Sequence, residues 1–210
     1  MVRILCIGDS HVPKRAKELS EKIYDKLNEI TELDLFDYTF FTGDEIDFPK
    51  LMNYLDLKTK NELFVVMGNM DYYYGNRNAP LHRKLDIIFK NNEKITIGLN
   101  HGAQISPRGD HDQLENLAIE MKYNILISGH THKEEVHLTK NGILLLNPGS
   151  VTGAWSFVAS LIPSFIELDI EENTKEIIVD LFQIDKQSRE IRAFKTKYQF
   201  KDERIKKLLV

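Results

Sequence analysis

Five short polar motifs, each placed directly after an apolar run of residues, constrain the fold of this chain more than any other feature. Short apolar runs bounded by glycine are typical of buried strands. In a layered α/β sheet the carboxyl ends of the strands meet at one edge, where binding sites are built. The sequence therefore predicts that the motifs converge on one site. In chain order they are Gly8-Asp9-Ser10-His11, Gly43-Asp44, Gly68-Asn69, His101-Gly102 and Gly129-His130-Thr131-His132.

The last motif is the richest in metal-binding groups. It places two histidines two residues apart, directly after the apolar run Ile125–Ser128. Imidazole is the commonest metal ligand in proteins. If the backbone there is extended, alternate side chains point to the same side, and both imidazoles are expected to face the site together.

The remaining apolar pattern predicts alternating helices and strands. Apolar residues at three- and four-residue steps predict helices at 16–30 and 112–123, and Pro49 opens a short helix at 48–55. Asn141-Gly142 predicts a hairpin turn. Strands are expected at 2–7, 36–42, 63–67, 85–89, 95–99, 125–128, 136–138, 143–146, 165–170, 177–184 and 191–200.

These elements predict one α/β domain over residues 1–200. The expected architecture is a four-layer αββα sandwich, in which two mixed β-sheets pack back to back and helices cover the outer faces. Residues 72–84 are polar and aromatic without a period, and they are expected to form a surface loop. Its three tyrosines are expected to pack onto the domain, with a partner-contact surface as the alternative. The tail, residues 201–210, is expected to be a frayed helix or disordered.

Composition narrows the class of protein. The chain has 210 residues, 42% of them hydrophobic and 29% charged, which is ordinary for a soluble globular protein. The net charge of −4 argues against a nucleic-acid binder held by bulk electrostatics. No segment approaches the roughly 20 apolar residues of a membrane helix. The one cysteine, Cys6, lies in the first apolar run, so it is expected to be a core residue of a cytosolic protein.

The side chains of the five motifs form a mixed nitrogen and oxygen donor set without thiolates, which suits manganese, zinc or iron. This set exceeds what one ion accommodates, so two divalent ions about 3.5–4 Å apart are expected, with Asp44 as the bridging carboxylate. Taken singly, an Asp-x-His after a strand is usually a turn or a helix cap, and His101 alone is more often a satisfied core histidine. Together they favour a metal site. The predicted ligands are Asp9, His11, Asp44, Asn69, His101, His130 and His132.

The order of the motifs resembles the calcineurin-like metallophosphoesterase superfamily. That resemblance implies a two-sheet sandwich with a dinuclear metal site at the strand ends. Carried over by position, one ion would take Asp9, His11, Asp44 and His132, and the other would take Asp44, Asn69, His101 and His130.

A second set of motifs, two of which lie outside the metal set, resembles the family of vacuolar protein sorting-associated protein 29, the small subunit of retromer. The resemblance implies a scaffold in endosome-to-Golgi retrograde transport, seated on the helical solenoid of vacuolar protein sorting-associated protein 35. It implies a cytoplasmic protein that reaches endosomal membranes only through its partners. Apolar residues around Phe182 and Ile184 are expected either to bind regulators or to belong to the core. The motifs are residues 8–15, residues 127–133, Asn147-Pro148-Gly149-Ser150-Val151-Thr152-Gly153-Ala154 and Ile162-Pro163-Ser164-Phe165.

One departure from the superfamily pattern bears on activity. Many active members carry histidine after the Gly-Asn pair, where it helps the leaving group, and this chain has Met70 there. A thioether can neither donate a proton nor carry charge. General acid catalysis is worth roughly 10²–10⁴ in rate, so weak or no phosphodiester hydrolysis is expected and no catalytic residue is assigned.

The alternative to the scaffold is a manganese- or zinc-dependent phosphodiesterase. Nucleic-acid processing is a third, weaker alternative.

Overall fold

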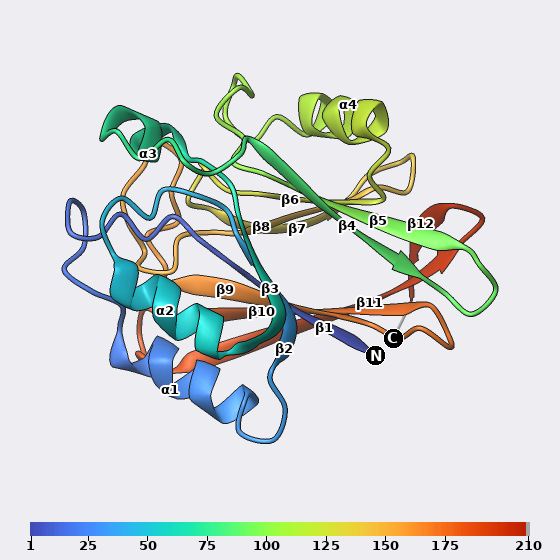
Figure 1. Cartoon of the computed structure of the whole chain (residues 1–210), viewed down its shortest axis with the longest axis horizontal. Coiled ribbons are helices and arrows are strands. Elements are labelled where there is room, and N and C mark those ends of the chain that lie inside the picture. Colours follow the sequence, from blue (N-terminus) through green and yellow to red (C-terminus); the bar gives the residue numbers. More distant parts are fainter. Residues whose placement is uncertain (209–210) are drawn as a thin grey trace.

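The computed structural model describes residues 1–208 of the chain, and these form two β-sheets packed face to face between layers of helix. Figure 1 shows α1 and α2 below the lower sheet and α4 above the upper one. The predicted four-layer αββα sandwich is therefore confirmed. The helices of the described residues are α1 (Glu21–Ile30), α2 (Pro49–Leu57), α3 (Asn69–Tyr73) and α4 (His111–Met121).

Both sheets are mixed. In the first, β1 pairs parallel with β2 and antiparallel with β9, so the amino-terminal strand lies in the interior of the sheet. In spatial order its strands are β12 (Arg204–Lys207), β11 (Ile191–Lys201), β10 (Glu176–Ile184), β9 (Ser164–Ile170), β1 (Val2–Ile7), β2 (Phe36–Phe41) and β3 (Thr59–Val65). The second sheet runs β4 (His82–Ile88), β5 (Lys94–Asn100), β6 (Ile125–Ser128), β8 (Leu144–Pro148) and β7 (Glu134–Leu138).

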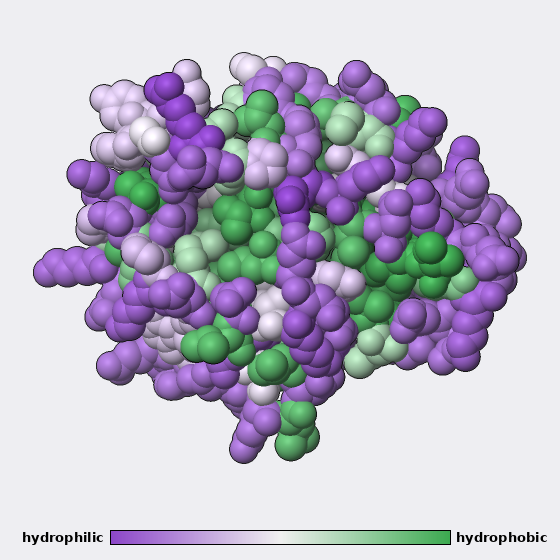
Figure 2. Space-filling view, viewed as in Figure 1, coloured by the Kyte–Doolittle hydropathy of each residue, from purple (hydrophilic) through white to green (hydrophobic). Residues whose placement is uncertain are grey.

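The hydrophobic core follows the layers. The largest cluster fills the space between the sheets and includes Cys6, which is fully buried as expected. Burial raises the pKa of the Cys6 thiol, which keeps it protonated and unreactive. A second cluster joins α1 and α2 to the first sheet, and a third joins α4 to the second sheet. Figure 2 shows a largely hydrophilic face with hydrophobic side chains across its middle.

The first predicted helix begins later than the sequence pattern indicates. The backbone of Ser20 is extended and accepts the first helical hydrogen bonds, so α1 starts at Glu21 instead of residue 16. The preceding segment is held in place by a bridge between Val12 and Ile46. Leu19 is buried in the core without being helical, which explains why the periodicity extended too far.

Two segments predicted to be irregular contain regular structure. Residues 72–84 include the end of α3 and the start of β4, and Tyr72, Tyr73 and Tyr74 are exposed instead of packed onto the domain. The tail forms β12, which pairs antiparallel with β11 and buries Ile205 between the sheets. The expected frayed or disordered tail is thus wrong for residues 201–208, and Leu209 and Val210 lie outside the described residues.

The two residues named for the apolar patch belong to the hydrophobic core, which is one of the two alternatives that the sequence leaves open. Phe182 and Ile184 are each less than a tenth exposed, and the ring of Phe182 stacks on Phe165 with centroids 4.8 Å apart. Ile184 also lines two surface pockets, one with Leu161 and Pro163 and the other with Ile162 and Phe194, so the expectation that regulators bind near these residues stays a prediction. Among residues 1–208, no helix has the length and apolar character needed to cross a membrane.

Candidate metal centre

The five motifs converge as the topology requires. Motifs after β1, β2 and β3 of the first sheet meet motifs after β5 and β6 of the second, at one end of the sandwich. Six of the seven predicted ligands are buried and Asn69 is half-buried. The side chains fall into two groups that share Asp44.

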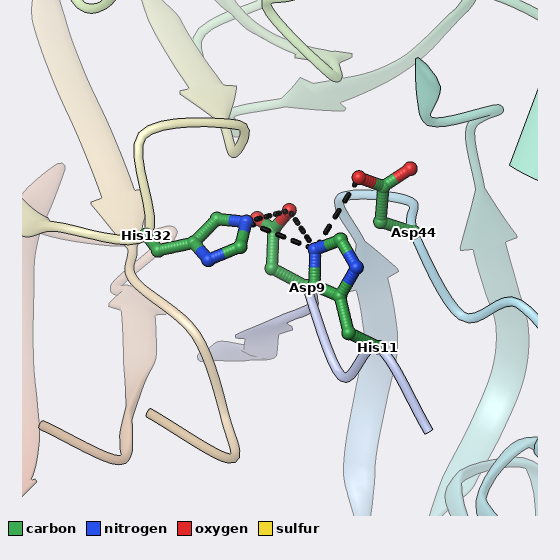
Figure 3. A group of neighbouring side chains, drawn as sticks. All are labelled: Asp9, His11, Asp44 and His132. Carbon is green, nitrogen blue, oxygen red and sulfur yellow. Dashed lines mark hydrogen bonds and ion pairs between the residues drawn. The ribbon is translucent and has the colours of Figure 1, made fainter. Parts of the chain in front are cut away.

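The first group, here called the Asp9 group, consists of Asp9, His11 and His132 with Asp44. One ligand atom from each of the four lies within 4.8 Å of the others. The Nε2 atoms of His11 and His132 are 2.9 Å apart, and Asp9 Oδ1 is 3.3 Å from His132 Nε2. Asp44 Oδ2 is 3.4 Å from His11 Nε2 (Figure 3).

The second group, the Asn69 group, consists of Asn69, His101 and His130 with Asp44. Asn69 Oδ1 is 2.9 Å from His130 Nδ1 and 3.1 Å from His101 Nε2. Asp44 Oδ2 lies 3.6 Å from the same His101 nitrogen. One oxygen of Asp44 therefore faces both groups, which is the placement that a bridging carboxylate needs.

The backbone at these strand ends is not extended. Asp9, His11, Asp44, His130 and His132 all have positive φ angles, between 49° and 68°. The expectation that His130 and His132 point the same way is wrong, because His132 belongs to the Asp9 group and His130 to the Asn69 group. Left-handed backbone at non-glycine residues is uncommon and clusters at functional sites.

Glycines make room for the carboxylates. A Cβ on Gly68 would collide with the carboxylate of Asp44, and one on Gly129 would collide with that of Asp9. Neither substitution would be relieved by a flexible side-chain end, since each carboxylate is itself held in the site.

The ring nitrogens are oriented for ligation. His101 Nδ1 donates to the carbonyl of Thr42 at 2.7 Å, and His132 Nδ1 donates to the carbonyl of Ala154 at 2.9 Å. In a neutral ring the Nε2 atom then carries a lone pair, and in both residues it faces oxygen acceptors. Acceptors that face one another repel unless a cation lies between them.

One further atom points to the same conclusion. Asp9 Oδ1 is buried and has no hydrogen-bond partner within the part of the chain that the structure describes. Buried polar atoms without partners are rare in native proteins and call for an ion or water. The residues of both groups thus fit divalent cations.

The charge states of Asp9 and His130 suit metal ligands as well. Although burial opposes ionisation of Asp9, the nearby rings of His132 and His11 hold the pKa of its carboxyl well below the usual range. Burial raises the pKa of Asp44, aided by the like charge of Asp9. Burial, with His101 and Arg108 nearby, lowers the pKa of His130 to about 3, so this ring is neutral at pH 7.

Comparison with known proteins places this site in a family. The model of the calcineurin-like phosphoesterase superfamily domain matches residues 2–173. The chain belongs to that superfamily. A relative from Methanothermobacter thermautotrophicus, named a probable metallophosphoesterase, is 35% identical over 146 residues, which cover 70% of this chain and 75% of the relative.

Solved structures share the fold of this phosphoesterase domain. A single mutant of Vps29 from Entamoeba histolytica superposes with a TM-score of 0.80 at 28% identity, covering 94% of this chain and all of that one. The wild-type protein from the same organism, described as complexed with Zn²⁺, superposes with a TM-score of 0.76 at 28% identity over 93% of this chain and 99% of that one.

Residues outside the predicted ligand set hold the phosphoesterase loops in place. The buried carboxylate of Asp71 accepts hydrogen bonds from the backbone N–H groups of Gly68, Asp44 and Ile46. It thereby ties the second motif to the third. In the sequence, Asp71 is the last residue of the Gly-Asn-x-Asp pattern. A search for metal ligands alone does not identify it, because it holds backbone groups instead of an ion.

The Asn-Pro-Gly-Ser motif supports the other loops. Asn147 Nδ2 donates to the carbonyl of Gly129 and to Thr131 Oγ1, which fixes the turn that carries His130 and His132. Ser150 Oγ donates to the carbonyl of Asp9 at 2.7 Å. The motif was recognised by resemblance, and the structure gives it a physical role.

Met70 stands beside the site. Its backbone N–H donates to Asp44 Oδ1 at 2.7 Å, and the N–H of Asp71 approaches the same oxygen at 3.3 Å. These two bonds leave Oδ2 of Asp44 for the two groups. The half-buried thioether of Met70 supplies no proton at this position.

Proposed function

We propose that the chain is a divalent-metal-dependent phosphodiesterase. The observation that carries the proposal is the pair of donor groups meeting at one oxygen of Asp44, in a chain of the calcineurin-like phosphoesterase superfamily. Manganese, zinc and iron fit the donors, and the Zn²⁺ complex of the Entamoeba Vps29 supports zinc. Two ions per chain are proposed.

When bound, such ions polarise a phosphoryl oxygen and lower the pKa of water enough to supply hydroxide near neutral pH. The chain's own residues orient the reaction. Asp71 and the N–H groups of Met70 and Asp71 fix the Asp44 carboxylate, and Asn147 fixes the histidine turn. Because Met70 donates no proton, the leaving oxygen is protonated by water, and esters with good leaving groups are the preferred substrates.

The test begins with protein freed of metal by chelation and reloaded with Mn²⁺ or Zn²⁺. Hydrolysis of bis(p-nitrophenyl) phosphate is measured for wild type, Asp44→Asn and the exposed control Asp56→Asn, together with bound metal by elemental analysis. We expect Asp44→Asn to lower kcat by roughly 10²–10³ and to lose bound metal, while the control matches wild type. Equal metal content and activity in all three would overturn the proposal.

We propose a scaffold role in a retromer-like complex as the second candidate. It is supported by the similarity to Vps29 structures over nearly the whole chain. It is also supported by Met70, whose thioether cannot donate a proton to a leaving group. In this role the protein would sit on a helical-solenoid partner of the vacuolar protein sorting-associated protein 35 type and reach endosomal membranes through it, in endosome-to-Golgi transport. Native purification from cells tests it: a complex containing a large helical-repeat subunit is expected, and a chain that always purifies alone contradicts it.

A further inference from the structure

The loop that follows the Asn-Pro-Gly-Ser motif holds two large aromatic side chains in solvent. Ala154 and Ser156 are buried, because the carbonyl of Ala154 accepts from His132 and Ser156 Oγ donates to the carbonyl of Thr131. The residues between and after them point outward: Trp155 is 55% exposed and Phe157 79%. The loop is thus pinned to the metal centre by alternate residues, and the other residues present an aromatic pair.

The two rings form a defined platform. Their centroids are 5.0 Å apart in an edge-to-face arrangement. Exposing large aromatic side chains forfeits the free energy of burying them, so an ordered exposed pair beside a site indicates contact with a ligand.

Two arginines, Arg15 and Arg108, contact this aromatic loop. Arg108 Nη1 donates to the carbonyl of His130, and its guanidinium lies 5.5 Å from the centre of the Phe157 ring. Arg15 Nη1 donates to the carbonyl of Trp155 at 2.8 Å. Among residues 1–208, the arginines paired with carboxylates are others, so the charges of these two remain available.

A second set of aromatic and cationic side chains belongs to α3, the helix that begins with Asn69. Tyr72, Tyr73 and Tyr74 are exposed, Lys14 Nζ lies 4.9 Å from the centre of the Tyr74 ring, and the Arg77 guanidinium lies 4.1 Å from that of Tyr72. Figure 1 shows α3 at the end of the sandwich where the loops after β1 and β2 also lie. The surroundings of the site are therefore aromatic and positive, although the whole chain is negative.

A ligand that matches this surface carries phosphates and flat, uncharged faces. We propose that the site takes a phosphodiester within a short single-stranded oligonucleotide, whose bases stack on Trp155 and Phe157 and whose phosphates contact Arg15 and Arg108. Base–aromatic stacking contributes about 1–3 kcal/mol per base, and guanidinium groups bind phosphate oxygens in pairs. This inference rests on the proposed phosphodiesterase function for its chemistry: water adds its oxygen to phosphorus, the bond to one nucleoside oxygen breaks, and that oxygen gains the proton.

The net charge of −4 argues against a protein that binds nucleic acid through bulk electrostatics. That argument applies to long duplexes held by many phosphate contacts, whereas a short strand held by stacking at one site needs only a local positive surface.

The first test measures binding without catalysis. Trp155 is the only tryptophan in the sequence, so its fluorescence reports on the platform directly. Protein freed of metal by chelation, which cannot hydrolyse the strand, is titrated with a thymidine tetranucleotide and with an abasic strand of the same charge. We expect the thymidine strand to quench Trp155 and to bind at least roughly tenfold more tightly than the abasic one. Equal affinity of the two strands, or no response to either, overturns the inference and leaves the surface as a protein contact.

The second test uses two esters with the same leaving group, the p-nitrophenyl ester of thymidine 5′-phosphate and methyl p-nitrophenyl phosphate. Phe157→Ala is expected to lower kcat/KM for the nucleoside ester roughly tenfold more than for the methyl ester. Phe194→Ala, an exposed aromatic of β11, is the control and leaves both values unchanged. Equal loss on both esters contradicts stacking. If wild type hydrolyses neither ester, the proposed function fails, and the fluorescence titration still decides the inference.

Discussion

The Asp9 group and the Asn69 group share one carboxylate but differ in charge and enclosure. The Asp9 group adds an ionised, fully buried carboxylate to two buried imidazoles. The Asn69 group adds a neutral amide that is half-buried, and His130, which is neutral at pH 7. Because the charge of the ligands governs affinity for a divalent cation, the Asp9 group is expected to bind its ion more tightly.

The difference also assigns different roles. All four side chains of the Asp9 group are buried, so its ion would act mainly to hold the surrounding loops together. The Asn69 group begins α3 and lies next to Met70 and to Arg108, which contacts the carbonyl of His130. The ion held there would be the one that exchanges and that meets substrate.

The largest effect is expected from Asp9→Asn. It removes the only carboxylate that belongs to the Asp9 group alone, so the tighter ion is lost and kcat falls by roughly 10³. Elemental analysis and p-nitrophenyl ester hydrolysis measure this, with Asp56→Asn as the control. A variant that keeps both ions would refute the assignment of the tighter site to this group.

His101→Ala is expected to act on the other ion. The weaker ion is lost, the affinity of the tighter ion is unchanged, and kcat falls by roughly 10². Calorimetric titration with Zn²⁺ separates the two binding steps, and His137→Ala, a histidine that stacks on His111 elsewhere, serves as control. Loss of the tighter step instead would reverse the comparison.

Gly68→Ala should weaken both ions equally. The added methyl group displaces the shared carboxylate of Asp44. Mutation of a residue that holds a metal ligand in position typically lowers metal affinity by roughly 10–100-fold. Gly75→Ala adds the same methyl group in open space and is expected to leave metal affinity unchanged. An effect confined to one ion would show that Asp44 does not bridge.

The smallest effect concerns Asp169, a carboxyl with one oxygen that has no hydrogen-bond partner among residues 1–208. It lies near the acids Glu167 and Asp180 instead of imidazoles. Burial, with the charge of Glu167, raises the pKa of Asp169 to about 6. The folded state therefore holds this proton more tightly than the unfolded chain, whose pKa is about 3.9, and stability falls as pH rises from about 4 to 6.

Asp169→Asn removes that pH dependence. After allowance for solvent screening, we expect it to stabilise the protein by roughly 1 kcal/mol at pH 7 and to change little at pH 4. Urea unfolding at both pH values measures the difference. Destabilisation at pH 7 would show that the ionised carboxylate has a partner.

The sequence predicts the layers and the convergence of the ligands because strand ends must meet at one edge. The division of the ligands between two ions follows only from the superfamily resemblance. The strand pattern alone does not predict it, because the left-handed backbone at His130 and His132 is imposed by distant contacts, such as that of Asn147 with the carbonyl of Gly129. The start of α1 and the strand β12 depend likewise on tertiary contacts, the Val12–Ile46 bridge and the burial of Ile205. The local pattern of apolar and polar residues in the sequence does not predict these tertiary contacts.

The most direct test of the whole account is a calorimetric titration of metal-free wild-type protein with Zn²⁺. Two binding steps of unequal affinity per chain are expected, with the tighter step missing in Asp9→Asn and the weaker step missing in His101→Ala. Absence of binding, or a single step that survives both substitutions, would contradict a centre built from two groups around Asp44.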